Sequence, residues 1–109
     1  MATVYKVLGQ SNPAATTATT LYTVPASTSA VVSTITVCNI GTVVGTFRIA
    51  IRPGGATLAN QHYLAYDATL SGSDVLTFTL GVTLATTDVI TVYASSANFA
   101  FSVFGSEIS

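Results

Sequence analysis

Apolar and polar residues alternate in several short runs along the chain, and this alternation predicts β-strands. The clearest run reads TFRIAIR. Because successive side chains of a strand point to opposite faces, Phe47, Ile49 and Ile51 share one face, which we expect to lie in the core. The other face consists of Thr46, Arg48, Ala50 and Arg52.

The same alternation recurs later in the chain. Leu76, Phe78 and Leu80 alternate with Val75, Thr77 and Thr79, so the first three are expected to point inward. Residues 99, 101 and 103 (Phe, Phe and Val) repeat the pattern near the C-terminus.

Runs rich in β-branched and aromatic residues are separated by Gly, Pro, Asn, Asp and Ser throughout, as in all-β proteins. We expect strands at about 3–8, 20–24, 30–39, 46–52, 62–69, 74–80, 88–94 and 99–104. Helical periodicity is sustained nowhere, and 109 residues are enough for one core. The prediction is an all-β, single-domain antiparallel β-sandwich, jelly-roll-like, of about eight short strands. Within it, residues 1–18 are expected to form an N-terminal strand and ordered arm, and residues 19–109 the sandwich proper.

The composition changes the expectation for the surface. Charged residues make up 6% of the chain, against about 25% in typical soluble proteins, whereas Thr and Ser together contribute 30 of the 109 residues. A soluble monomer usually carries interspersed charges. We therefore expect much of this neutral surface to face other protein, in a homo-oligomer that we predict to be a trimer.

Charge and hydropathy argue against other partners. A net charge of −1 offers little attraction for nucleic acid or anionic lipid. The charge-free run from residue 7 to residue 47 is interrupted by SNPAATTATT and TVPASTS, so no span of about 20 mainly apolar residues fits in it. The N-terminal sequence MATVYKVLG lacks the pattern of a signal peptide. We expect synthesis in a cytoplasm and no membrane partner.

Candidate catalytic groups are few. His62 is the only histidine, and in HYLAYD strand alternation separates it from Asp67. No G-x-S-x-G motif is present, and SGSD at 71–74 is typical of a turn. The acidic residues Asp67, Asp74, Asp88 and Glu107 are dispersed along the chain. We therefore expect no catalytic site, cofactor or metal.

Two further features favour structural roles. The single cysteine, Cys38, lies in the run VVSTITVCNI and is expected to be a buried thiol. The PGG of RPGGATLA is expected to be a turn, because a phosphate-binding loop would need a following helix.

A resemblance to known proteins is carried by four segments: YKVLGQ at 5–10, TTLYTVPASTSAVVSTITVCN at 19–39, FRIAIRPGGATLANQHYLAYD at 47–67 and FSVFGSEI at 101–108. They resemble small β-sandwich virion structural proteins of tailed bacteriophages, which are associated with the head or the tail. The resemblance implies a structural component present in many copies, and it carries over no functional residue.

Together with the neutral surface, this resemblance leads us to expect a non-enzymatic capsid decoration or cement protein that binds the major capsid protein. The alternative is a receptor- or carbohydrate-binding module of a tail fibre, tail or baseplate. Such a module would use exposed Tyr63, Tyr66 or Tyr93 as stacking platforms.

Arg48 and Arg52 are expected on one face of their strand, with Cα atoms about 13 Å apart at about 3.3 Å per residue. One interpretation is that they are solubilising charges. The other is that they bind carboxylates across an interface, because the planar guanidinium binds carboxylate in a bidentate manner. Asp67 and Asp74 of another copy, or acidic residues of the capsid protein, are the candidate partners.

Overall fold

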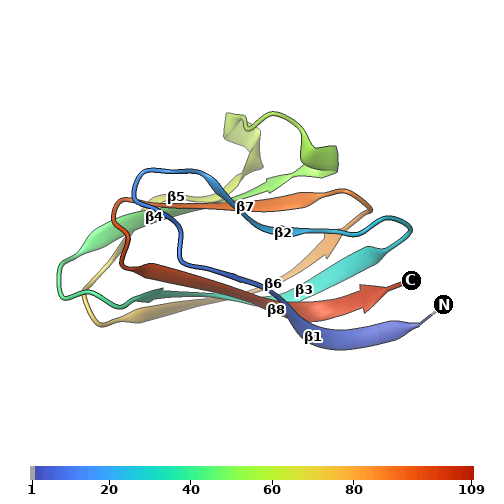
Figure 1. The fold of residues 1–109 in the computed structure, drawn as a ribbon, viewed down its shortest axis with the longest axis horizontal. Helices are drawn as coiled ribbons and strands as arrows, with labels where there is room; N and C mark the ends of the chain where they lie inside the picture. Colours follow the sequence, from blue (N-terminus) through green and yellow to red (C-terminus); the bar gives the residue numbers. More distant parts are fainter. Residues whose placement is uncertain (1) are drawn as a thin grey trace.

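The computed structural model describes residues 2–109 as two antiparallel four-stranded sheets that pack face to face (Figure 1). The strands are β1 (Thr3–Ser11), β2 (Thr19–Thr23), β3 (Ser29–Asn39), β4 (Gly45–Arg52), β5 (Tyr63–Leu70), β6 (Val75–Leu84), β7 (Val89–Ala94) and β8 (Phe99–Ile108). Two short 3-10 turns, η1 (Pro53–Gly55) and η2 (Asn60–His62), lie between β4 and β5. The predicted all-β sandwich and its eight strands are confirmed.

The strand order is that of a jelly roll. One sheet, which we call the first sheet, has the order β1-β8-β3-β6, and the second sheet has the order β2-β7-β4-β5. Only the β4–β5 connection stays within one sheet, and every other connection crosses from one sheet to the other. This arrangement, two nested Greek keys of eight strands, leaves strands distant in sequence side by side.

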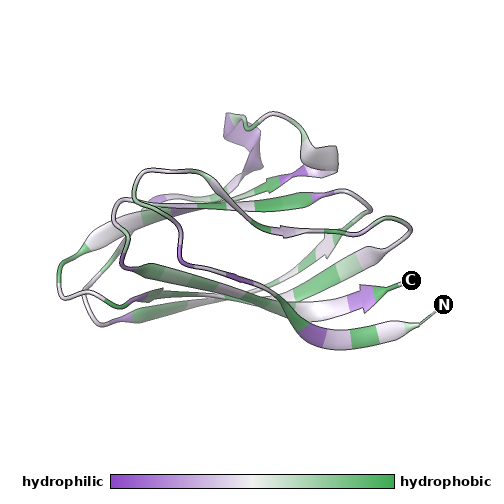
Figure 2. Ribbon diagram, in the orientation of Figure 1, coloured by the Kyte–Doolittle hydropathy of each residue, from purple (hydrophilic) through white to green (hydrophobic). Residues whose placement is uncertain are grey.

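The core lies between the sheets and uses the alternation that the sequence showed. Phe47 and Ile49 of β4 are fully buried, as are Phe99, Phe101 and Val103 of β8. The predicted inward faces of both strands are confirmed, apart from Ile51, which is only partly buried at the margin of the core. Figure 2 shows that hydrophobic residues concentrate in the strands of both layers.

The burial predicted for β6 is only partly correct. Leu76 and Phe78 face inward opposite Val37 and Ile35 of β3, yet Leu76 is 37% exposed and Leu80 is 43% exposed. The reason is that β6 is an edge strand, so of Leu76, Phe78 and Leu80 only Phe78, which has the largest side chain, packs against the core.

The N-terminal residues form part of the first sheet. β1 is its other edge strand and pairs with β8, and the backbones of Ala2 and Ser109 exchange two hydrogen bonds. The two chain ends therefore lie side by side (Figure 1). Residues 12–18 then cross to the second sheet, and the side-chain amide of Asn12 donates to the carbonyl oxygens of Ala97 and Phe99 at 2.9 and 2.6 Å.

Cys38 is half-buried, so the prediction of a buried thiol is wrong. It lies on the outer face of the first sheet, where it pairs with Val75 of β6 and Ala100 of β8. Cys38 is half-buried because β6 and β8 flank it on either side.

A polar link closes one edge of the sandwich. The Tyr22 hydroxyl of β2 donates to a Glu107 carboxylate oxygen of β8 at 2.5 Å, and the Lys6 ammonium of β1 lies 2.9 Å from the other oxygen. Burial, and next the bond to Glu107, raise the pKa of Tyr22 well above its ordinary range. The bonds from Tyr22 and Lys6 lower the pKa of Glu107.

This link predicts that the free energy of unfolding falls at both low and high pH. The free energy of unfolding should fall below about pH 4.3, where unfolded Glu107 takes up a proton that the folded carboxylate resists. It should also fall above about pH 10, where Tyr22 ionises in the unfolded chain and stays neutral in the folded protein. Tyr22→Phe should lower the free energy of unfolding at neutral pH by about 1.5 kcal/mol, because it removes a hydrogen bond to a charged group.

Urea denaturation at pH 3, 7 and 10.5 measures this profile. In Tyr22→Phe the part of the stability loss above pH 10 that comes from Tyr22 should be absent. The loss at low pH should be smaller than in wild type but should remain, because Lys6 still bonds to Glu107. Tyr5→Phe is the matched control, because Tyr5 is 83% exposed and should behave as wild type. Equal pH profiles for Tyr22→Phe and wild type would contradict the prediction.

Candidate functional site

The outer face of the second sheet holds a cluster of Arg48, Asp67 and three tyrosines. Arg48 of β4 pairs with Tyr93 of β7 on one side, and β5 lies on its other side. The Arg48 guanidinium carbon lies 4.2 Å from the ring centroid of Tyr93 and 4.2 Å from that of Tyr66. Both distances are well within the range of cation–π interaction, about 6 Å.

A β-bulge in β5 creates this arrangement. Phe47 pairs with Ala68 and Ile49 pairs with Ala65, so two residues, Tyr66 and Asp67, lie opposite Arg48 alone. Asp67 takes a positive φ of 51°, a conformation that Asp tolerates better than most residues. The bulge places both side chains on the side of Arg48. Regular alternation of side chains is therefore interrupted at Tyr66 and Asp67.

Arg48 and Asp67 form a bidentate ion pair. The Arg48 Nε donates to Asp67 Oδ1 at 2.7 Å, and Nη2 lies 3.4 Å from Oδ2. The hydrogen bond to Asp67 raises the pKa of the Arg48 guanidinium further above its usual range. The pair is partly solvated, with the side chains 24% and 44% exposed, so its main effect is to fix the orientation of the guanidinium rather than to stabilise the fold.

Arg52 has a different role. Its Nε donates to the Ala56 carbonyl at 2.7 Å, its Nη2 to the Gly55 carbonyl at 3.0 Å, and its Nη1 reaches the Thr91 hydroxyl at 3.3 Å. PGG forms the expected turn, with positive φ at Gly54 and Gly55. Arg52 thus holds the segment after β4 against β7.

The four residues predicted to lie at an interface are not gathered at one place. Arg48 contacts Asp67 of its own chain, and Arg52 contacts its own loop. Asp74 lies in the turn before β6, where its side chain accepts from the Val75 amide at 2.8 Å. Their role in an interface between chains stays a prediction.

The remaining candidate polar groups have local roles. His62 ends η2 instead of beginning β5, is nearly buried, and accepts through Nδ1 from the Ala59 amide at 3.1 Å. Asp88 caps turns by accepting from the amides of Gly54 and Ala85. Within residues 2–109, no three His, Cys, Asp or Glu side chains gather as metal ligands would, and no helix could cross a bilayer.

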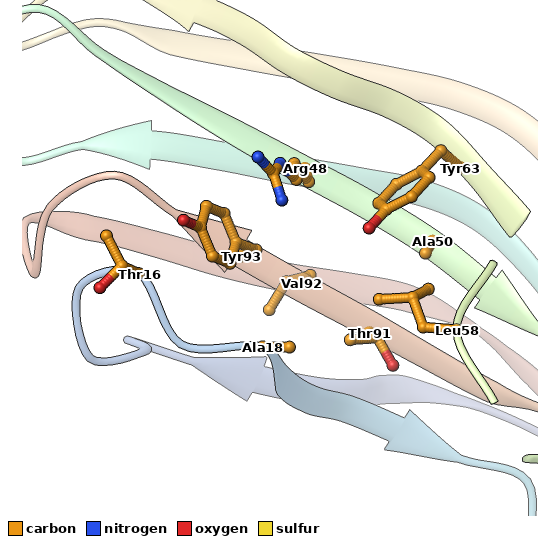
Figure 3. Close-up of a pocket in the computed structure, with 9 residues that line it drawn as sticks. All are labelled: Thr16, Ala18, Arg48, Ala50, Leu58, Tyr63, Thr91, Val92 and Tyr93. Atoms are coloured by element: carbon orange, nitrogen blue, oxygen red, sulfur yellow. The ribbon is translucent and has the colours of Figure 1, made fainter. Parts of the chain in front are cut away.

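A hollow of about 230 Å³ lies beside Arg48, and we call it the tyrosine hollow. Its floor consists of the paired residues Ala50 of β4 and Thr91 of β7, with Val92 beside them, and Ala18 lies at its edge. Tyr63 and Leu58 border one side of it, and Tyr93 and Thr16 border the other (Figure 3). Ala50 was predicted on the outer face with Arg48, and it is nevertheless buried, because it lies at the bottom of this hollow.

A second hollow adjoins the tyrosine hollow at Tyr63. Tyr63 meets Tyr66 edge to face, with ring centroids 4.8 Å apart, and both border a second, more open hollow together with Asn60. The sequence named the tyrosines as possible platforms but gave no sign that the 12–18 and 53–62 segments frame them. The one local signal was Asp67, a residue type depleted in strands, inside a run that otherwise predicts a strand.

Comparisons of the chain with protein-family models, with curated proteins and with solved structures find no match.

Arg52→Ala should loosen the loop after β4. The variant leaves the carbonyls of Gly55 and Ala56 without their charged donor, so we expect the Ala56 amide, which bonds to the Pro53 carbonyl, to exchange about tenfold faster. A tenfold change corresponds to about 1.4 kcal/mol of local opening free energy. Hydrogen exchange followed by NMR measures it, and Arg48→Ala is the control that should leave this amide unchanged. Unaltered exchange of the Ala56 amide in Arg52→Ala would show that Arg52 does not hold the loop.

Proposed function

We propose that this protein is a non-enzymatic structural protein of a bacteriophage virion, a capsid decoration or cement protein that stabilises the head. The observation that carries the proposal is the outer face of the first sheet, which offers a broad neutral surface for contact with other protein. The resemblance of the sequence to small phage virion proteins supports the biological setting.

The outer face of the first sheet carries no charged side chain among the described residues. Strand register assigns its positions, because paired residues of neighbouring strands point to the same side. These positions are Thr3, Tyr5, Val7, Gln10, Ser29, Val31, Ser33, Thr34, Thr36, Cys38, Val75, Thr77, Thr79, Thr83, Ala100, Ser102, Phe104, Ser106 and Ile108. The nearest ion pair, Lys6 with Glu107, bonds toward Tyr22 of the second sheet and so lies on the inner side.

The face is large enough for a stable contact. Four strands spaced about 4.8 Å apart and about 30 Å long present roughly 600 Å². Burying this face against an equal surface would remove about 1,200 Å² from water in total, which is the lower end of the range for specific protein interfaces. Short Thr, Ser and Val side chains lose less conformational entropy on contact than Lys or Glu would.

Symmetry constrains how copies can use this face. Two copies that pair through the same face form a closed dimer, whereas a ring trimer needs contact between two different patches. A second exposed apolar patch exists in the β3–β4 loop, where Ile40, Val43 and Val44 are all exposed. The predicted trimer therefore requires the face of one copy to meet a patch such as this loop on the next.

Charging the face should weaken self-association. We expect Tyr5→Lys to raise the dissociation constant of the oligomer at least tenfold, because the ammonium would have to be desolvated in a neutral contact. Val43→Lys should have a similar effect in a trimer and none in a face-to-face dimer. Thr69→Lys, an exposed position on β5, is the control.

Sedimentation equilibrium across micromolar concentrations measures these constants. A wild-type protein that stays at the 11.1 kDa monomer mass throughout this range would contradict the expectation of self-association. Capsid binding would then have to rely on the face of a single copy.

The virion assignment has its own test. Purified particles of the phage that encodes the chain should contain it in many copies on the head by mass spectrometry and antibody-labelled electron microscopy. Particles without it should lose infectivity and release DNA at a lower temperature than wild type, and the purified protein should restore tolerance, whereas Tyr5→Lys should restore less. Labelling confined to the tail, with unchanged head stability, would refute the decoration role.

A further inference from the structure

The tyrosine hollow has the shape of a small-ligand site. Its volume of about 230 Å³ lies below the range of about 300–1,000 Å³ typical of pockets for drug-sized ligands, so it suits a ligand of about one ring. Ala50 and Thr91 in its floor are both buried, so the floor is closed by the sheet. The walls come from the segments on either side, 12–18 and 53–62, and binding residues often lie on such connections over a rigid sheet.

The polar groups at its rim are already held in place. Asp67, Tyr66 and Tyr93 fix the Arg48 guanidinium, and among the described residues no acceptor bonds to its Nη1. Arg52 fixes the loop that leads to Leu58. A ligand that accepts from Arg48 therefore pays little to order the site, which is the general advantage of preorganisation.

The charge balance favours a neutral ligand. Asp67 neutralises Arg48 in a bidentate pair. The second nearby cation, Arg52, directs its donors to the carbonyls of Gly55 and Ala56 and to Thr91. The rim thus offers donors and acceptors together without an uncompensated charge aimed into the hollow.

From these observations we propose that the tyrosine hollow binds a neutral sugar ring, as a monosaccharide or the terminal residue of a glycan. A pyranose has an apolar C–H face, which fits an aromatic ring, and hydroxyls at its edges that both donate and accept. Tyr63 supplies the ring and points its hydroxyl toward the hollow (Figure 3). Arg48 and Tyr93, which border the hollow, supply hydrogen bonds to the sugar hydroxyls.

The site is separate from the proposed assembly surface, because it lies on the outer face of the second sheet and that surface lies on the first. Either proposal can therefore fail without the other. With sugar binding, the protein would attach to glycans in addition to its proposed structural role.

NMR titration of the ¹⁵N-labelled full chain tests the proposal. The probes are the methyl pyranosides of glucose, galactose and mannose and N-acetylglucosamine, each to tens of millimolar, together with an array of immobilised oligosaccharides. At least one neutral sugar should shift the Arg48 Nε–H and the amides of Ala50, Tyr63 and Tyr93. Tyr63→Ala and Tyr93→Ala should weaken its binding at least tenfold, and Tyr63→Phe, which keeps the ring, should weaken it less.

Tyr5→Ala is the matched control, since it removes an exposed tyrosine from the opposite sheet and should bind sugar as wild type does. Thermal melting confirms that each variant is folded, and Tyr63→Phe keeps the test usable if Tyr63→Ala does not fold. The proposal is overturned if no probe binds, if the shifts map to the first sheet, or if Tyr63→Ala binds as wild type. Glucuronate or inorganic phosphate binding more tightly than every neutral sugar would overturn it in favour of an anion site, and capture of only proline-rich peptides would overturn it in favour of a peptide groove.

Discussion

The contact of one phenylalanine with three others holds the two sheets together. Phe47 of the second sheet lies with its ring centroid 6.0 Å from Phe78 and 6.2 Å from both Phe99 and Phe101 of the first sheet. Two of the three pairs are edge to face, a geometry worth about 0.5–1.5 kcal/mol per pair beyond the burial of area. Because Phe47 sits on β4 beside β5 and β7, its inward position also determines which residues of β4 face outward.

The outward residues of β4 follow from that constraint. With Phe47 and Ile49 committed to the core, Arg48 must point away from it. The bulge in β5 then adds one residue on the outer face, so that the guanidinium meets both a carboxylate and a tyrosine ring from the same strand. The orientation of Arg48 beside the tyrosine hollow is thus a consequence of core geometry in β4 and of an extra residue in β5.

The two outer faces of the sandwich have different chemistry. The first sheet presents uncharged hydroxyl and apolar groups over its whole width, which suits contact with protein. The second sheet presents an ordered arginine among tyrosines and is framed by two connecting segments, which suits a compact ligand. A jelly roll separates these faces because its crossing connections leave the outside of each sheet free.

The sequence by itself determined the fold class and most of the core. Alternation depends only on the period of two along a strand, so it correctly located eight strands and assigned Phe47, Ile49, Phe99, Phe101 and Val103 to the interior. It could not show which strands are edges, and the burial of Leu76 and Leu80 was overestimated for that reason. It also could not show the bulge at Asp67, because the extra residue exists only relative to the partner strand β4. Three features join residues that are distant in sequence. They are the ion pair of Arg48 with Asp67, the contact of Arg52 with Thr91, and the position of the 12–18 and 53–62 segments beside the tyrosine hollow. Tertiary structure alone decides them, since strand order and loop paths arise from the way the whole chain closes on one core.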